Sequence, residues 1–458
     1  MTLFQNEHPF ITTRAVHLDL KGLPPTPKRL TEWLDFVQAC KFNAILLELE
    51  DQFPWTIDTR FRNATYYTPS EIRTLTSEAD RRNIQLIPLV QCLGHLEMVL
   101  RHDDYAHLRE RPDTIDLLNP LANGATPLIQ SMINDVLELM PNVQYFHLGG
   151  DEAWHFGSNT ETQTYIHQHG KGALYLQHIQ PMLTQLNRQQ IRPILWHDMM
   201  IDWDTDTLRK LSTQADLITW GYQGNPETAD HHYNAKHIQT LANAGFSLWA
   251  GTAYKGADNI MDSSLPCPIQ REENALAWIK QAKQHHMHSM VATGWSRYSY
   301  SRLQCDPNDA ALDCMALIAS IMYDGKAPEG GIQTCRTWLK SIPAAKPFDA
   351  CYFAAKTFED IIAQGWRLVR YADEQQIFSE QDPSRDPGLS TEYLGKQSTK
   401  LLQRLPDVQQ QIHAAFKDLI DPIWINEYLS TRIIPLRKHL QNLQQQPIEA
   451  QEMSPMKL

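Results

Sequence analysis

Short hydrophobic segments alternate along the chain with longer stretches in which hydrophobic residues recur at helical spacing. Two of the longer stretches begin at Thr26-Pro27 and Thr68-Pro69, which are typical helix starts. Strands that alternate with helices form parallel sheets, and eight of them can close into a barrel. The pattern therefore predicts an α/β fold, the (β/α)8 TIM barrel. The eight segments predicted as its strands are 14–20, 43–49, 84–91, 143–148, 191–196, 215–220, 246–251 and 290–295.

The pattern changes beyond residue 323, where only helical spacing continues. We expect a barrel domain at 1–323, a C-terminal helical region at 324–446 and a disordered tail at 447–458. The sequence leaves open whether the helical region packs on the barrel or makes a subunit contact, as in a homodimer.

Composition and charge narrow the class of protein. With 42% hydrophobic and 21% charged residues, the chain has the composition of a globular protein. It has no apolar run long enough to cross a bilayer and no secretory signal pattern, so we expect a cytoplasmic protein with no membrane partner. The formal net charge of −12 disfavours nucleic acid. Seven scattered cysteines without CxxC spacing predict reduced thiols.

The segment His147-Leu148-Gly149-Gly150-Asp151-Glu152 ends the fourth predicted strand. Barrel enzymes build their sites at this end of the strands. The glycine pair would let the backbone approach a ligand closely, and adjacent carboxylates on an extended backbone would point in different directions, toward two atoms of one substrate. The residues alone leave an alternative, because Asp-Glu is also common in the first turn of a solvated helix.

Other strand ends carry carboxylates, imidazoles and indoles. Glu50 and Asp51 follow the second strand, and His95 and Glu97 follow the third. A surface ion pair is the simpler account of any one of them, but their joint placement favours a single polar site. Four tryptophans close to the ends of strands five to eight would form a flat apolar box of the kind on which sugar rings stack. These are Trp196, Trp220, Trp249 and Trp295.

Metal, nucleotide and serine-hydrolase chemistry are not indicated. HExxH, a phosphate-binding glycine loop and Gly-x-Ser-x-Gly do not occur. The histidine pairs at 231–232 and 285–286 lie in polar, helix-like stretches, which favours a solvated face over a metal site. We expect no metal and no organic cofactor.

Taken in order, the strand-end motifs resemble glycoside hydrolase family 20, the β-N-acetylhexosaminidases, and most of all its hexosaminidase D branch. The resemblance covers roughly residues 14–305. It implies a retaining exo-acting hydrolase that removes terminal β-linked GalNAc or GlcNAc from an oligosaccharide. The motifs are HLDLKG at 17–22, LEDQFPW at 49–55, PLVQCLGH at 88–95, AHLRE at 106–110, HLGGDE at 147–152, WAGTAYKGA at 249–257 and TGWSRY at 293–298.

The resemblance also implies a mechanism. The substrate's own 2-acetamido oxygen would attack the anomeric carbon, giving an oxazolinium intermediate without an enzyme nucleophile. Glu152 would act as general acid and then base, with a raised pKa, and Asp151 would stabilise the acetamido nitrogen. Tyr254 would hold the acetamido oxygen. The implied supporting roles are pocket walls for Trp196, Trp220 and Trp249, a place near the sugar ring for Trp295, and hydrogen bonds to the acid for His95 and His147.

Two positions depart from the pattern of the secreted and lysosomal relatives. Lys21-Gly22 stands where those relatives carry an arginine, and Ser296-Arg297 follows Trp295 where they show Trp-x-Glu. Either Lys21 or Arg14 is expected to replace the arginine. The residues expected to rebuild the binding of the sugar hydroxyls are Glu50, Asp51, Arg297 and Tyr298.

Two other functions stay open on the sequence. One is a sugar-binding barrel that has lost catalysis. The other is a barrel glycosidase that uses two enzyme carboxylates, for instance Glu152 with Glu50.

Overall fold

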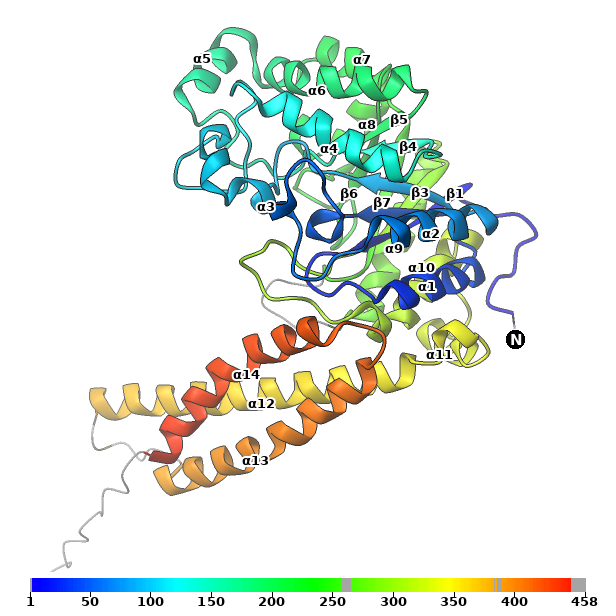
Figure 1. Cartoon of the computed structure of the whole chain (residues 1–458). Helices are drawn as coiled ribbons and strands as arrows, with labels where there is room; N and C mark the ends of the chain where they lie inside the picture. Colours follow the sequence, from blue (N-terminus) through cyan, green and yellow to red (C-terminus); the bar gives the residue numbers. More distant parts are fainter. Residues whose placement is uncertain (1, 258–264, 383, 385–388, 446–458) are drawn as a thin grey trace, which may run out of the picture. The chain divides into compact units, whose positions relative to one another are not determined.

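A computed structural model of the protein describes residues 2–257, 265–382, 384 and 389–445. The chain divides into two compact units, Met1–Phe348 and Asp349–Leu458 (Figure 1). The tail predicted at 447–458 lies outside the described residues.

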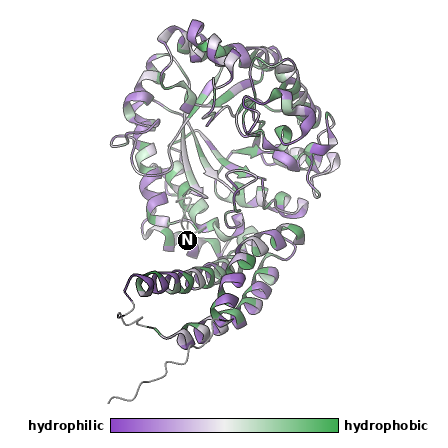
Figure 2. Cartoon of the chain, turned by 90° about the vertical axis from the view of Figure 1, so that its left-hand side faces the viewer, coloured by the Kyte–Doolittle hydropathy of each residue, from purple (hydrophilic) through white to green (hydrophobic). Residues whose placement is uncertain are grey.

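The first unit contains eight parallel strands that pair in sequence order and close on themselves. Seen from one end, the barrel is enclosed by helices (Figure 2). This confirms the predicted (β/α)8 barrel. The strands are β1 (Thr13–Asp19), β2 (Ala44–Glu48), β3 (Gln85–Leu89), β4 (Tyr145–His147), β5 (Arg192–Trp196), β6 (Asp216–Trp220), β7 (Leu248–Lys255) and β8 (Ser289–Gly294).

Helices follow the strands as the hydrophobic spacing predicts. The Thr26 side chain caps its helix by accepting from the Arg29 N–H, and Thr68 forms a capping box with Glu71. The main helices of the unit are α1 (Pro27–Ala39), α2 (Pro69–Arg81), α4 (Ala125–Leu139), α6 (Lys171–Arg188), α7 (Thr205–Ser212), α8 (Ala235–Asn243), α9 (Pro268–Gln284), α10 (Leu312–Asp324) and α11 (Gly331–Leu339). Shorter helices in the loops include η1 (Glu50–Gln52), α3 (Glu97–Leu100), η3 (Asp103–Leu108), α5 (Thr160–His169), η4 (Asp198–Met200) and η5 (Asn308–Ala310).

The barrel interior is apolar through most of its depth and becomes polar near the carboxyl ends of the strands. His17, Glu48 and His147 point inward there and are almost completely buried. Since buried polar groups are costly unless they are paired, this layer marks the end of the barrel where a site can form. The apolar cluster of the barrel interior consists of Ala15, Ala44, Leu46, Ile87, Leu89, Ile194, Trp196, Ile218, Trp249 and Val291.

The second unit is helical, as predicted for the C-terminal extension. Its helices are α12 (Phe348–Gln381, whose first residue belongs to the first unit), α13 (Thr391–Phe416) and α14 (Pro422–Gln445). Phe358 of α12 packs on Tyr428 of α14, with ring centroids 5.4 Å apart, and the Ser398 hydroxyl of α13 donates to the Leu440 carbonyl of α14.

The predicted domain boundary at residue 323 falls inside α10, which contacts β1, β7 and β8, whereas the compact units divide after Phe348. Among the described residues, no helix combines the length and apolar character needed to cross a membrane.

Candidate active site

The loop after β4 has a strained backbone that brings two carboxylates to the end of the barrel. Gly149, Gly150 and Glu152 all have left-handed φ angles, of 62°, 81° and 48°. A Cβ atom at Gly149 would collide with the Gln91 side chain, and one at Gly150 would collide with the Tyr175 hydroxyl. The glycine pair therefore fits against buried side chains of the protein itself. This corrects the expectation that the glycines leave room for a ligand and that the backbone at Glu152 is extended.

The loops after β3 and β4 bring Asp151, Glu152 and His95 together. His95 Nε2 lies 3.5 Å from Asp151 Oδ2 and 3.4 Å from Glu152 Oε2. Gly94 makes this approach possible, because a Cβ at that position would meet the Asp151 backbone carbonyl. Three residues that the sequence placed at two separate strand ends thus form one cluster.

The protonation of His95 and Glu152 depends on their neighbours in the cluster. Burial by itself would lower the His95 pKa, but the Asp151 and Glu152 carboxylates raise it well above its usual value. Burial by itself would raise the Glu152 pKa, but the neighbouring His95 holds it below its usual value. The expected raised pKa of Glu152 is therefore corrected, because the neighbouring His95 imidazole lowers it.

The same three residues are the group of potential metal ligands that the described part of the chain brings together, with ligand atoms within 4.8 Å of one another. A protonated imidazole has no lone pair to offer a metal, so a metal ion at this cluster would have to displace the proton that the neighbouring carboxylates favour on His95.

Asp198, at the start of η4 after β5, is a site residue that the sequence did not single out. Its Oδ2 accepts the Glu152 backbone N–H at 2.8 Å, and its Oδ1 accepts the Trp220 indole N–H at 3.1 Å. Burial, and next the Asp151 charge, raise the pKa of Asp198 to about 7. Its place after a strand was visible in the sequence, but its two partners come from the ends of β4 and β6.

Three of the four predicted tryptophans gather beside the carboxylates. The rings of Trp196 and Trp295 lie 6.1 Å apart between centroids. Trp220 stacks on Tyr222 at 5.1 Å, and Tyr222 lies 6.1 Å from Trp295. Burial raises the Tyr222 pKa well above its usual value, and the Asp151 charge also raises it. Tyr222 is a second residue that the sequence did not single out, although it follows Trp220-Gly221 at a predicted strand end.

Trp249 does not belong to this wall. It is the second residue of β7, and its indole N–H donates to Asp216 Oδ2 at 3.2 Å, at the beginning of β6. Its ring contacts Tyr145, the first residue of β4, with centroids 5.4 Å apart. Because β7 continues to Lys255, Trp249 lies near the amino end of the barrel as part of the core. The prediction for Trp249 is corrected.

Tyr254 also faces away from the cluster. In β7, Trp249 points into the barrel, so alternation places Thr252 on the outer face. The pairing is irregular between Ala253 and Lys255, so the position of Tyr254 follows from its contacts. The Thr252 hydroxyl donates to Asn274 of α9 at 2.7 Å, and the Tyr254 hydroxyl donates to Asn308 of η5 at 3.2 Å. The prediction that Tyr254 holds a substrate oxygen is corrected.

Lys21 lies at the end of β1, inside a buried ionic cluster. Its Nζ is 3.0 Å from Glu48, 3.4 Å from Asp19 and 3.5 Å from Glu50. Burial opposes its charge, but these carboxylates raise the Lys21 pKa well above its usual value. The Tyr300 hydroxyl donates to Glu50 Oε2 at 3.4 Å. Lys21 and Glu50 are therefore brought together in one buried cluster at the carboxyl ends of β1 and β2.

Arg14 and His147 have structural partners instead. Arg14 is the second residue of β1, and its guanidinium donates to the carbonyls of Ile11, Thr12 and Lys41 at 2.7–2.9 Å. It lies at the amino end of the strand, so it cannot replace an arginine after β1. His147 Nδ1 accepts the Gly149 backbone N–H at 2.9 Å. Burial lowers the His147 pKa to about 3. His147 thus holds the turn and does not bond to the acid.

Of the remaining predicted residues, Tyr298 lies at the cluster and two others support the loops. The Tyr298 ring is 5.8 Å from the His95 ring. The Asp51 carboxylate accepts from the Gln52 and Asn63 side-chain amides at 2.9 and 2.5 Å. The backbone N–H of Arg297 donates to Asp19 at 3.2 Å.

Of the histidine pairs, His232 differs from its predicted place on a solvated helix face. It lies in the loop between β6 and α8, and its ring packs on Trp220 with centroids 4.2 Å apart. Burial lowers the His232 pKa to about 4. A neutral imidazole therefore borders the aromatic wall.

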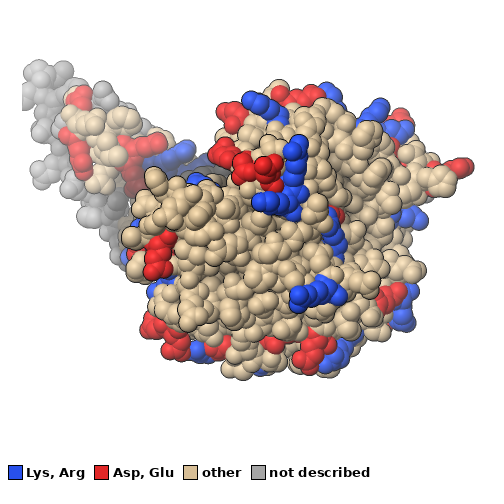
Figure 3. Space-filling model, turned by 90° about the horizontal axis from the view of Figure 1, so that it is seen from above, with Lys and Arg blue, Asp and Glu red and all other residues tan. Residues whose placement is uncertain are grey.

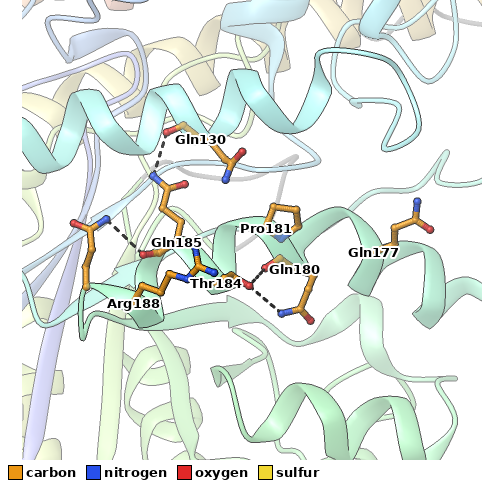
Figure 4. A pocket seen from close by; sticks show the side chains of 8 residues that line it. Gln130, Gln177, Gln180, Pro181, Thr184, Gln185 and Arg188 are labelled. Atoms are coloured by element: carbon orange, nitrogen blue, oxygen red, sulfur yellow. Dashed lines mark hydrogen bonds between the residues drawn. The ribbon is translucent and has the colours of Figure 1, made fainter.

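A separate groove of about 850 Å³ lies on the outer helices, between α4 and α6 (Figure 4). Its walls are mostly glutamines, and several of their amides bond to the groove itself, as where Gln185 donates to the Gln130 carbonyl at 3.4 Å. The face of the molecule seen in Figure 3 shows Lys and Arg interspersed with Asp and Glu. The groove contains no acid or base pair, so the cluster at the strand ends is the candidate active site.

Comparison with known proteins gives a consistent result. The model for "Glycosyl hydrolase family 20, catalytic domain" matches residues 12–296. The chain is 32% identical over 327 residues to hexosaminidase D of Bos taurus, an alignment that covers 69% of this chain and 93% of that protein. It is also 32% identical over 324 residues to hexosaminidase D of Homo sapiens, covering 68% of this chain and 66% of that protein.

Two solved structures are similar in fold. A β-N-acetylhexosaminidase from Bacteroides fragilis aligns with a TM-score of 0.56 at 14% identity, over 73% of this chain and 72% of that one. A chitobiase from Flavobacterium johnsoniae aligns with a TM-score of 0.57 at 16% identity, over 95% of this chain and 71% of that one.

Proposed function

Because the chain belongs to glycosyl hydrolase family 20 and is therefore a glycoside hydrolase of the β-N-acetylhexosaminidase type, we propose that it removes terminal β-linked GalNAc or GlcNAc with retention, by substrate-assisted catalysis. In this reaction the 2-acetamido oxygen of the sugar attacks its own anomeric carbon. The leaving oxygen takes a proton from the enzyme, and water later opens the oxazolinium ring.

The proposal rests mainly on the hydrogen bonding of the two Asp151 carboxylate oxygens. Its Oδ2 faces His95, while its buried Oδ1 has no hydrogen-bond partner among the described residues. A buried acceptor without a partner is costly, so Oδ1 is suited to receive a substrate N–H. An acetamido N–H that turns into a cationic iminium N–H would bind there more tightly in the transition state than in the ground state.

Glu152 is the proposed acid and base, with His95 as its proton partner. Its carboxylate is only partly buried, as a group that exchanges protons with substrate and water must be. A bound sugar would remove water from Glu152 and raise its pKa, while His95, 3.4 Å away, can return a proton to it. The reading with two enzyme carboxylates is weaker, since Glu50 is occupied by Lys21 and Tyr300.

Trp196, Trp220 and Trp295 are proposed to enclose the acetamido group, with Tyr222 replacing Tyr254 as the donor to the acetamido oxygen. The Tyr222 ring stacks on Trp220 and lies near Trp295, and its hydroxyl lies close to the Thr293 and Trp295 side chains within reach of the Asp151 charge. We propose that the methyl and carbonyl of an acetamide bind beside this ring. The Lys21 and Glu50 cluster is proposed to bind the outer hydroxyls of the sugar.

Tyr222 and Tyr254 provide a matched pair of substitutions. Tyr222→Phe is expected to lower kcat by about 10- to 100-fold, because it removes a hydrogen bond to an oxygen that develops charge. Tyr254→Phe removes the same hydroxyl on the outer face of β7 and should leave kcat within about twofold. Steady-state kinetics on a nitrophenyl β-N-acetylhexosaminide decides between them, and the reverse order of effects would restore Tyr254 to the site.

The proposed function is tested with nitrophenyl β-glycosides of GalNAc, GlcNAc and plain galactose, with and without a thiazoline that mimics the oxazolinium. We expect turnover of the two acetamido sugars only, inhibited by the thiazoline, because only those sugars carry the nucleophile. Cleavage of the plain galactoside that resists the thiazoline would indicate a two-carboxylate enzyme. Binding of the thiazoline without turnover of any substrate would indicate a sugar-binding barrel.

A further inference from the structure

Asp198 is a buried carboxylate at the candidate site that the proposed mechanism does not use. It lies at the start of η4 and is only 9% exposed. One of its oxygens accepts the Glu152 backbone N–H at 2.8 Å, and the other accepts the Trp220 indole N–H at 3.1 Å. Because both oxygens are engaged by the protein itself, Asp198 is suited to hold other groups in place and not to contact a substrate.

The first of these bonds acts on the backbone of Glu152, whose φ angle of 48° lies in the left-handed region. A residue with a Cβ atom keeps that conformation only where its surroundings hold it there. Asp198 holds the N–H on one side of the Glu152 Cα, and the Trp154 N–H holds the Glu152 carbonyl on the other side at 2.7 Å. Since the backbone angles set the direction of the Cα–Cβ bond, the Asp198 carboxylate bears directly on where the Glu152 carboxylate lies.

A carboxylate is a costly group at the position of Asp198. Burial disfavours its charge, and so do the charges of Asp151 and Glu152, which lie close enough to raise the Asp198 pKa. An asparagine of nearly the same shape would avoid this cost, but its amide has only one oxygen and would turn a donor toward the second N–H. The need to accept from two donors at once therefore accounts for a carboxylate at this position.

We propose that Asp198 is a positioning residue that orients Glu152 for proton transfer and ties it to the Trp220 indole, so that an acetamido group seated against Trp220 steadies the acid. This inference rests on the proposed function, in which Trp220 encloses the acetamido group and Glu152 protonates the leaving oxygen. A single planar carboxylate joins the two groups through bonds of 2.8 and 3.1 Å. Binding of the reacting group and placement of the acid are thereby coupled.

The test is Asp198→Asn, assayed on a nitrophenyl and a dinitrophenyl β-N-acetylhexosaminide. We expect kcat on the nitrophenyl glycoside to fall by about 10- to 100-fold, since a displacement of about 1 Å at a reacting group costs on the order of 100-fold. On the dinitrophenyl glycoside kcat should fall by no more than about threefold, because that leaving oxygen needs little protonation. In Glu152→Gln, which has already lost the acid, adding Asp198→Asn should lower kcat on the nitrophenyl glycoside by less than about threefold.

Asp216→Asn is the matched control. The Asp216 carboxylate also accepts an indole N–H, from Trp249 at 3.2 Å, and is 5% exposed, but it lies at the amino end of the barrel. The change should lower the melting temperature and leave the ratio of the two kcat values within about twofold. Trp220→Phe keeps an aromatic ring, removes the indole N–H at the other end of the link, and should shift the ratio in the same direction as Asp198→Asn. It provides the measurement if Asp198→Asn does not fold.

Equal losses on both glycosides in Asp198→Asn, or losses that multiply with those of Glu152→Gln, would show a general structural role and overturn the inference. An unchanged ratio of kcat values in Trp220→Phe would overturn the link to the acetamido pocket. A wild-type protein that hydrolyses neither glycoside would instead contradict the proposed function itself.

Discussion

Replacing Glu152 with glutamine is expected to lower kcat/KM for nitrophenyl β-N-acetylhexosaminides by about 10²- to 10⁴-fold, the usual contribution of a general acid or base. Glutamine keeps the size of the side chain and can still face His95, but it cannot transfer a proton to the leaving oxygen. The loss should be smaller for a dinitrophenyl glycoside, whose leaving group needs less protonation. Initial rates on both substrates give the comparison.

Two controls make the Glu152 result specific. Glu161→Gln makes the same chemical change on the exposed first turn of α5 and should leave kcat/KM within twofold. The affinity for the thiazoline should be retained in Glu152→Gln, since that inhibitor needs no proton. Equal losses on both leaving groups would argue against Glu152 as the acid.

Replacing Asp151 with asparagine is expected to lower kcat by about 10²- to 10³-fold, the usual cost of removing one electrostatic contact to a developing charge. The carboxylate that would stabilise the acetamido nitrogen becomes neutral, and the buried amide can present an N–H where an acceptor is needed. His95 also loses one of the charges that raise its pKa. Because the thiazoline mimics the cyclised acetamido group, its affinity should fall in Asp151→Asn.

The two carboxylates are thereby distinguished by one inhibitor, whose affinity should depend on Asp151 and not on Glu152. Asp113→Asn is the matched control, because it makes the same change at an exposed ion pair with Arg111. Thermal melts of each variant exclude loss of folding as the cause of lost turnover. Wild-type thiazoline affinity in Asp151→Asn would contradict its proposed contact with the acetamido group.

The sequence by itself determined the architecture and which residues meet at the centre of the candidate site. Hydrophobic segments of strand length and helical spacing are local properties, so the barrel, the capped helices at Thr26 and Thr68 and the C-terminal helices could be predicted. Because parallel strands bring their carboxyl ends to one side of the barrel, Asp151, Glu152 and His95 could also be placed together.

Only the tertiary structure decided which way individual side chains face and how they are charged. Trp249 belongs to the barrel core, and Tyr254 is buried on the outer face of the barrel, because of where β7 begins and ends. The sequence placed the carboxyl end of this strand four residues short, at 251 and not 255. Asp198 reaches Glu152 through a contact between different strand ends, and the Glu152 pKa follows from its distance to His95. The direction of a side chain, its long-range contacts and its electrostatic coupling depend on distances across the closed barrel. A linear pattern of residues does not contain those distances.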